Sequence, residues 1–277
     1  MSMLKEGDEH IYSYSQLSTF DECPFAFYLD KIEENNKDDR LSNAFAERGS
    51  LIHDILDKWA RGKLTKPQML TEYKNRYGCE VVTQFPKIMV KGYAEKAYNI
   101  GIDYLTEFDE FENYEVIASE EKFFINLELS DGTTRPFVGI IDLMLKDKRT
   151  GELIICDHKS KSWSAFKKAE KTMYRQQLLY SAYVKEKYGQ FPDVLMFNLF
   201  NEMGDKAEKP FEESEYKEAV QWATDCILKM ESYDVLDWMQ SKEVPDFYCQ
   251  FLCSTRGNCY VSKMKVEPKT KRKKKTS

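Results

Sequence analysis

Residues 136–162 read PFVGIIDLMLKDKRTGELIICDHKSKS, and the interpretation of the whole chain starts from this stretch. Two apolar runs flank a polar turn, which is typical of two neighbouring β-strands. The first run carries Asp142, the second carries Asp157, and Lys159 follows two residues later. Strand side chains alternate between faces, so Asp157 and Lys159 share one face. Acids in a mostly buried strand are costly unless they are paired or bind a cation.

The two acids predict a site for Mg²⁺ or Mn²⁺, because these hard cations take oxygen ligands. A cation at this place polarises a phosphodiester and lowers the pKa of a bound water molecule, and Lys159 either orients that water or stabilises charge on the phosphoryl oxygens. Glu120 or Glu121, on a preceding strand, adds another acid, and the sequence leaves both candidates open. For an Asp-x-Lys motif taken alone, the plain alternative is a surface ion pair.

The segments around this stretch predict an α/β fold with a mixed central sheet flanked by helices. Alternating and helical periodicities give the expected elements after the first hundred residues. These are strands at 114–129, 135–146, 153–159 and 194–200, helices at about 164–188 and 213–240, and a polar loop at 201–212. The earlier chain is expected to be helical, with a break at Cys23-Pro24, a helix at 46–62, and a helical insertion at 64–112 in which Phe85-Pro86 starts a helix.

The overall composition bounds the class of protein. The chain has 277 residues and a net charge of −6, yet residues 263–277 hold eight Lys/Arg against one Glu. Such a basic tail is either a solvated, disordered end or an arm for nucleic acid. No apolar run approaches the roughly 20 residues that span a bilayer, and the N-terminus has no apolar signal segment, so we expect a cytoplasmic protein without a membrane partner.

The domain expectation follows from these elements. We expect one domain over residues 1–262 and a basic disordered tail at 263–277. Within the domain, the helical part and insertion take about 12–112, the α/β core about 113–200, and a C-terminal helix and cysteine segment about 211–262.

Three further sets of residues are candidates for chemistry. His53 lies on the flank of an apolar helix stripe, where an ordinary helix histidine is the favoured interpretation for it alone. Gln176 and Tyr180 are four apart on the helix after the acidic strand, so they share a face that can point at the site.

The third set is cysteine. Cys249, Cys253 and Cys259 have the spacing C-x3-C-x5-C, which favours metal ligation over free thiols in an intracellular protein. Cys23, at the predicted helix junction, is the best fourth ligand. Four thiolates suit either a [4Fe–4S] cluster or Zn²⁺.

Taken in order, these motifs resemble the RecB-like branch of the PD-(D/E)xK nuclease superfamily, which includes CRISPR-associated and phage exonucleases. The matching stretches lie in the order typical of that branch. They are SQLSTFDECPFAFYL (15–29), RGSLIHDIL (48–56), GIIDLM (139–144), CDHKSKS (156–162), QQLLY (176–180) and the terminal cysteines. The cysteine spacing departs from the usual C-x2-C-x5-C by one residue.

The resemblance implies a restriction-endonuclease-like core and a metal-dependent DNA exonuclease, acting on single strands or DNA ends in recombination, repair or phage DNA metabolism. It also implies a role for each matching residue. His53, Asp142, Asp157 and the His158 carbonyl bind Mg²⁺ or Mn²⁺, Lys159 is the catalytic lysine, Gln176 and Tyr180 position DNA or site side chains, and Cys23, Cys249, Cys253 and Cys259 hold [4Fe–4S].

The sequence also bears on partners. It contains no GxxxxGK[ST] loop, so a helicase partner would be a separate chain. The rival from another class is a non-catalytic DNA-binding or assembly subunit of a recombination or CRISPR-adaptation complex. The full set His53, Asp142, Asp157 and Lys159 argues against it. Cleavage polarity, exonuclease or endonuclease preference, and oligomeric state are not specified by the sequence.

Overall fold

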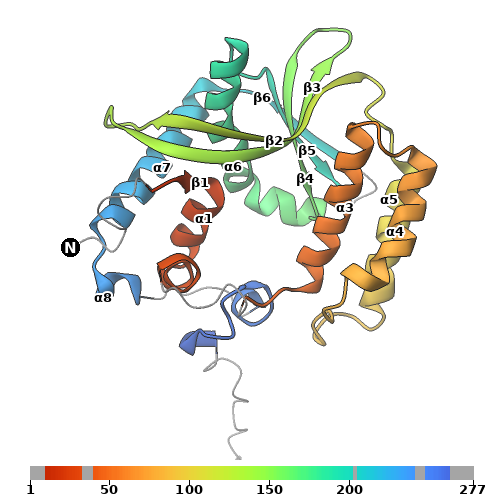
Figure 1. Ribbon diagram of the computed structural model, residues 1–277, viewed down its shortest axis with the longest axis horizontal. Helices are drawn as coiled ribbons and strands as arrows, with labels where there is room; N and C mark the ends of the chain where they lie inside the picture. The colour runs from red at the N-terminus through yellow and green to blue at the C-terminus, as the bar shows by residue number, and fades with distance from the viewer. Residues whose placement is uncertain (1–9, 33–39, 202–204, 241–246, 263–277) are drawn as a thin grey trace, which may run out of the picture.

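The computed structural model describes residues 10–32, 40–201, 205–240 and 247–262, and its centre is a six-stranded mixed sheet (Figure 1). The predicted α/β class, with helices flanking a mixed sheet, is therefore confirmed. The strands are β1 Tyr12–Ser13, β2 Tyr114–Glu128, β3 Thr134–Asp147, β4 Leu153–Lys159, β5 Val194–Leu199 and β6 Asp205–Pro210.

The helices lie before, between and after these strands. They are α1 Tyr14–Glu22, α2 Pro24–Phe27, α3 Ala44–Ala60, α4 Lys66–Glu80, α5 Tyr93–Glu107, α6 Trp163–Tyr188, α7 Glu213–Ser232 and α8 Val235–Trp238, with π-helical turns at Tyr28–Ile32 and Tyr248–Leu252. None of the described helices combines the length and apolarity needed to cross a membrane.

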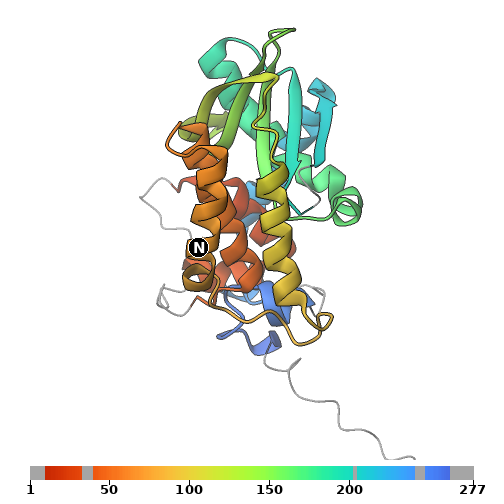
Figure 2. The ribbon, with the colours of Figure 1, turned by 90° about the vertical axis from the view of Figure 1, so that its right-hand side faces the viewer.

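The helices form a layer on each face of the sheet. On one face, α1, α6 and α7 pack against side chains such as Ile155 and Phe197. On the other, α3, α4 and α5 enclose a second core that includes Ile154, Cys156 and Met196. Figure 2 shows α3, α4 and α5 side by side in front of the sheet. The alternation predicted for β4 is thus observed, with consecutive residues facing different cores.

The strand β3 organises the sheet because three strands pair with it. β2 follows it antiparallel along nearly its whole length. On the opposite edge, β1 pairs parallel with 137–138, and β4 pairs antiparallel with 143–146. Residues 139–142 lie between those two partners. β4 pairs with β5 on its other edge from 154 to 159, but its last three residues have no register partner on β3, so the sheet splits beside Asp142.

Two strands differ from the expectation. β6 occupies part of the predicted polar loop 201–212, and it pairs antiparallel with β5 at the sheet edge. Its sequence, DKAEKP, is mostly polar, which is typical of an edge strand, where charged side chains discourage pairing with other chains. The two-residue β1 was predicted as part of a helix, and it is too short to leave a periodic pattern.

Two helices also differ. The helix predicted to start at Phe85-Pro86 begins at Tyr93, since Pro86 opens a turn closed by Met89 and Gly92 adopts a left-handed φ of 78°. The long helix predicted over 213–240 ends at Ser232, where Tyr233 takes an extended conformation before the short α8.

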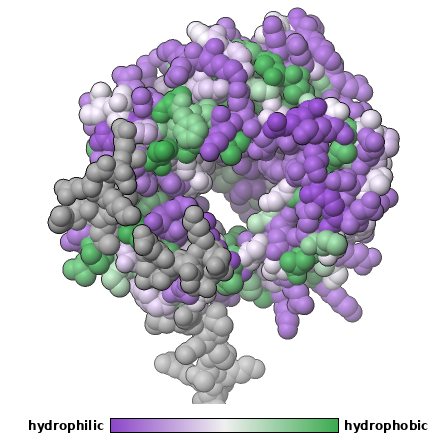
Figure 3. Space-filling view, in the orientation of Figure 1, coloured by the Kyte–Doolittle hydropathy of each residue, from purple (hydrophilic) through white to green (hydrophobic). Residues whose placement is uncertain are grey.

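The N-terminal elements and the cysteine-bearing segment surround an opening. The space-filling view shows the molecule hollowed at its centre, between α1 and α3 (Figure 3). Segment 248–257 joins both sides. Arg256 donates to the carbonyls of Leu41 and Ser42 at 3.1 and 2.5 Å, and the Leu41 N–H donates to the Ser254 carbonyl at 2.9 Å.

Candidate metal centre

The split between β3 and β4 sets the position of the first acid. Where the strands part, the His158 N–H loses its strand partner and donates instead to Asp142 Oδ2 at 2.9 Å. This hydrogen bond fixes the carboxylate of Asp142 next to the end of β4. The predicted convergence of the acids of two neighbouring strands is therefore observed, and its cause is the local divergence of the sheet.

A chain of polar contacts runs from the second acid to helix α6. Lys159 Nζ lies 3.0 and 2.7 Å from the two carboxylate oxygens of Asp157. The same ammonium donates to Gln176 Oε1 at 3.4 Å, and Gln176 Nε2 donates to the Tyr180 hydroxyl at 3.3 Å. The helix face predicted from the four-residue spacing thus points at the acidic strand end.

Helix α3 brings His53 to the same place. Its Nδ1 lies 3.4 Å from Asp142 Oδ2, although 89 residues separate the two in the sequence. Asn43 caps the start of this helix, accepting from the Ala46 N–H, and buried Ile52 and Ile55 anchor the helix on the second core. The amphipathic pattern therefore presents His53 at the edge of the apolar stripe, towards β3.

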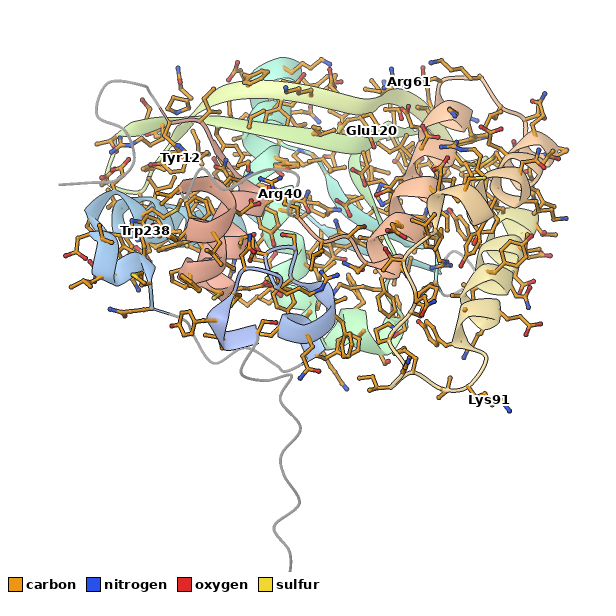
Figure 4. All side chains as sticks on the ribbon, turned by 60° about the horizontal axis from the view of Figure 1, so that its bottom comes forward. Tyr12, Arg40, Arg61, Lys91, Glu120 and Trp238 are labelled. Carbon is orange, nitrogen blue, oxygen red and sulfur yellow. The ribbon has the colours of Figure 1, made fainter. Side chains whose placement is uncertain are left out.

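The sequence left open whether Glu120 or Glu121 lies near the other acids, and the two side chains have different surroundings in the structure. Glu121 forms an ion pair with Lys187 of α6. Glu120 falls opposite Asp142 in the β2–β3 register and lies near Arg61 at the end of α3 (Figure 4). Ligand atoms of His53, Glu120 and Asp142 all lie within 4.8 Å of one another.

The electrostatics of these acids reflect crowding and burial. Burial, opposed by Lys159, raises the pKa of Asp157 to about 6. Burial also raises the pKa of Asp142. For Glu120, burial together with the charges of Asp142 and Asp57 raises the pKa to about 7. Three carboxylates therefore share a site in which their charges are costly, and a bound cation would offset that cost.

The pKa values of the two basic side chains of the site, Lys159 and His53, shift in opposite directions. Burial opposes the charge of Lys159, yet the nearby Asp157 and Asp142 outweigh it and raise its pKa, so the lysine stays an ammonium. Burial lowers the pKa of His53, which keeps the imidazole neutral and able to act as a metal ligand.

Gly139 makes room for the helix side of the site. A Cβ atom at this position would lie 2.4 Å from Phe123 Cζ and 2.8 Å from Tyr180 Cε1. Because both rings are buried, neither has free space to withdraw into. The glycine of GIIDLM is therefore required by the close approach of the Tyr180 ring to β3.

The site opens into a cavity of about 990 Å³. Its walls come from α1, α3, β2, β3 and α6, and they mix acids with small and aromatic side chains. The lining includes Ser15, Phe45, Gly49, His53, Glu120, Lys122, Asp142, Gln176 and Tyr180. The cavity and the central opening of Figure 3 are bounded by the same elements, so the acids are reached from that opening.

The donor set fits a divalent cation. Carboxylate oxygens with one imidazole nitrogen are ligands for Mg²⁺ or Mn²⁺. Within the described part of the chain, His53, Glu120 and Asp142 are the set of three potential ligands that lie close together. Asp157 lies near them, since its charge raises the pKa of His53 and the charge of Asp142 raises the pKa of Asp157. His158 reaches the site through its backbone, whereas its ring Nδ1 lies 2.9 Å from Asn198 Nδ2.

The cysteines gather at a second place. Cys23 and Cys253 are buried in one cluster, against which Cys259 packs. Cys249 begins the same segment and is also buried, and its carbonyl accepts from the Ser262 hydroxyl. The expected approach of Cys23 to the C-terminal cysteines is therefore observed for Cys253 and Cys259. Four thiols of this kind suit iron–sulfur or zinc by donor chemistry.

Sequence reasoning missed the residues that support the site from behind. Asn198 of β5 donates to the Tyr104 hydroxyl at 2.7 Å and also contacts the His158 ring. Asp57 accepts from Arg61 and from the Ser119 hydroxyl beside Glu120. A polar Asn inside the buried run VLMFNLF was the available signal for the first of these, because buried polar groups need partners.

The chain was compared with protein families, curated proteins and solved structures. A family model described as PD-(D/E)XK nuclease superfamily matches residues 11–260. Among curated proteins, none matches the chain. The crystal structure of SSO0001 is similar, with 13% sequence identity and a TM-score of 0.32, over 86% of this chain and 95% of that chain.

Proposed function

Because this chain belongs to the PD-(D/E)XK nuclease superfamily, whose members are metal-dependent nucleases, we propose that it is a DNA exonuclease requiring Mg²⁺ or Mn²⁺. The observation that carries the proposal is the convergence of Asp142, Asp157, Lys159 and His53 at the split in the sheet. A site without chemistry has no reason to collect buried acids whose charges are costly.

We assign roles from the positions of the side chains. His53, Asp142, Asp157 and the His158 carbonyl would hold the cation, which would polarise the phosphodiester and lower the pKa of a water molecule. Lys159, which stays protonated, stabilises the negative charge that develops on the phosphoryl oxygens. Gln176 and Tyr180 hold the lysine in place from α6.

The substrate we propose is a single strand of DNA entered from an end. The support is the central opening, which leads to the acids between α1 and α3. Phe45 and Lys122 line the cavity, where an aromatic face can stack on a base and an ammonium can contact a phosphate. Recombination, repair or phage DNA metabolism is the proposed setting, with any helicase supplied as a separate chain.

We also propose that Cys23, Cys249, Cys253 and Cys259 hold a [4Fe–4S] cluster, with Zn²⁺ as the alternative. The support is the burial of Cys23 and Cys253 in one cluster, with Cys259 packed on it. The role would be structural, because hydrolysis transfers no electrons. Anaerobically purified protein should be brown and contain four iron atoms per chain; a colourless protein with one zinc atom would establish the alternative.

The activity is tested with linear single-stranded DNA labelled at the 5′ or the 3′ end, in Mn²⁺. We expect stepwise shortening by the wild-type protein and none by Asp157→Ala. Asp225→Ala, which removes an exposed acid of α7, is the control and should cleave normally. Circular dichroism checks that both variants fold. Cleavage by Asp157→Ala at the wild-type rate would refute the assignment.

A further inference from the structure

The β2–β3 pair has one buried face and one face that carries exposed apolar side chains. Along β2 the side chains alternate, so Phe123 and Ile125 enter the first core while Phe124 points away from it. The Phe124 side chain is 59% exposed, and Ile140 of β3 is 43% exposed. Large apolar side chains held together in water do not stabilise the fold, and such groups mark binding surfaces.

The strand register places these side chains next to one of the acids of the metal centre. Phe124 lies opposite Val138 in the β2–β3 pairing. Two residues nearer the site, Lys122 lies opposite Ile140. The next residue on the same face of β3 is Asp142, because side chains two apart along a strand share a face. The exposed face therefore leads directly to the acids.

This face also joins two cavities. Lys122 and Ile140 line the cavity of the candidate metal centre. Ile11, Phe124 and Pro136 line a second cavity, of about 360 Å³, beside β1. At about 3.3 Å per residue, the stretch of β3 between the acid and the second cavity is roughly 20 Å long. A surface of this length accommodates more than one nucleotide of an extended strand.

The chemistry of the face suits a single-stranded polynucleotide. Lys122 Nζ lies 4.9 Å from the centre of the Phe124 ring, and the lysine is exposed. A base stacks on an aromatic ring, and a flexible ammonium beside that ring can move aside to contact the adjoining phosphate. Charge complementarity and continuity with the metal centre therefore both favour a polynucleotide as the occupant.

We propose that the outer face of β2–β3 binds the single strand next to the nucleotide that is cleaved, with a base stacked on Phe124 and neighbouring bases packed on Val138 and Ile140. This inference rests on the proposed nuclease function and extends it to the part of the substrate that lies outside the metal centre. Phe124 belongs to none of the motif stretches of the sequence. Its role would be to hold the strand while the acids act on it.

The test is the binding of fluorescein-labelled oligothymidylate to metal-free protein in EDTA, followed by fluorescence anisotropy. A strand of about 16 nucleotides covers the largest site size usual for such surfaces. Phe124→Ala should raise the Kd about 5- to 150-fold, the range for loss of one stacked base. Phe124→Trp should bind as wild type, and the strand should quench its added fluorescence.

The matched control is Leu236→Ala, which removes an exposed apolar side chain from α8 and should leave the Kd unchanged. Thermal unfolding verifies that all three variants fold. In cleavage assays with Mn²⁺, Phe124→Ala should raise KM by a similar factor and change kcat by less than about threefold, because the ring does not touch the acids.

The outcomes separate this inference from the function beneath it. An unchanged Kd for Phe124→Ala, or no binding by the wild-type protein, would overturn the inference even if the protein cleaves DNA. Binding that is lost in Phe124→Ala and kept in Phe124→Trp, in a protein that leaves DNA intact, would support the face and refute the nuclease. A dimer that Phe124→Ala dissociates without any change in Kd would assign the face to a second copy of the chain and overturn the inference.

Discussion

The hydrogen bonds that connect Asp157 to helix α6 all depend on the side chain of Lys159. Its ammonium joins Asp157 to Gln176, and through Gln176 to Tyr180. We expect Lys159→Met to lower the cleavage rate about 100- to 1000-fold, the range found when one preorganised stabilising group is removed. Single-turnover cleavage of a labelled strand measures this.

Lys161→Met is the matched control for that prediction. Lys161 lies two residues further along, beyond the end of β4, and we expect its loss to change the rate by less than about threefold. The assigned role of Lys159 is wrong if Lys159→Met stays within the same range as the control, with both variants folded.

The residues of the site could be predicted from the sequence only where they lie close together along the chain. Asp142, Asp157 and Lys159 follow from two adjacent strands, since the alternation of side chains fixes their faces. The choice between Glu120 and Glu121 did not follow. It depends on the β2–β3 register, which shifts between Val116 and Ala118, and on a backbone conformation that no sequence pattern announces.

Among the elements, the crossing of α6 over β3 is controlled by Gly139. We expect Gly139→Ala to lower the free energy of unfolding by about 1–3 kcal/mol, because the new methyl group overpacks the Phe123 and Tyr180 rings. Displacement of Tyr180 should reduce cleavage as well. Urea unfolding and the strand-shortening assay measure the two effects.

A second glycine gives the comparison for that substitution. A Cβ atom at Gly78, within helix α4, meets no heavy atom within 4 Å. Gly78→Ala should therefore raise the free energy of unfolding by about 0.5–1 kcal/mol through helix propensity. If Gly139→Ala and Gly78→Ala change the free energy of unfolding equally, the Phe123 and Tyr180 rings move freely to accept the new methyl group. That result would contradict the argument that Gly139 is required by close packing.

Two interactions hold the strand β1 in place. Its two residues pair with β3, and its Tyr12 also donates a hydrogen bond to an ion pair between Glu231 and Arg135. Glu231 of α7 accepts from the Tyr12 hydroxyl at 3.0 Å and from Arg135 at 2.7 and 3.0 Å. The hydrogen bond from Arg135 lowers the pKa of Glu231 below its ordinary value of 4.5. The folded state therefore binds fewer protons here, so this contact stabilises the fold above about pH 4.5 and is lost as pH falls.

Glu231→Gln should lower the melting temperature at pH 7 by roughly 2–4 °C, and the difference from wild type should be smaller at pH 3. Glu218→Gln is the control on the same helix, where an exposed pair with Lys171 contributes little. Scanning calorimetry at both pH values decides the matter, and a pH-independent difference would contradict the linkage.

These elements also mark the limit of sequence reasoning about the fold. The strand β4 and the helix α6 have long, clear periodic patterns, and their observed bounds lie within a residue of those expected. The strand β1 has only two residues, and β6 has six residues that are mostly polar. They exist because β3 and β5 offer unpaired edges, which is tertiary information.

For the molecule as a whole, the opening between α1 and α3 predicts a dependence on DNA ends. β1 fastens one side of the N-terminal elements to β3, and α3 fastens the other side to the second core. We expect linear single-stranded DNA to be shortened and a covalently closed circle of the same sequence to remain intact. Gel electrophoresis after equal incubation in Mn²⁺ compares them. A circle cut as fast as the linear strand would place the substrate outside the opening.

The hydrogen bonds from Arg256 to residues 41–42 connect the two sides of the opening, and this connection would affect how fast a DNA strand threaded through the opening dissociates. A polymer enclosed by protein on all sides can leave only along its own length, so dissociation is slower than it would be from an open groove. Successive cleavages by one molecule should then outnumber new encounters. With DNA in large excess, the products would be untouched strands and very short remnants, with few of intermediate length, the signature of a processive enzyme.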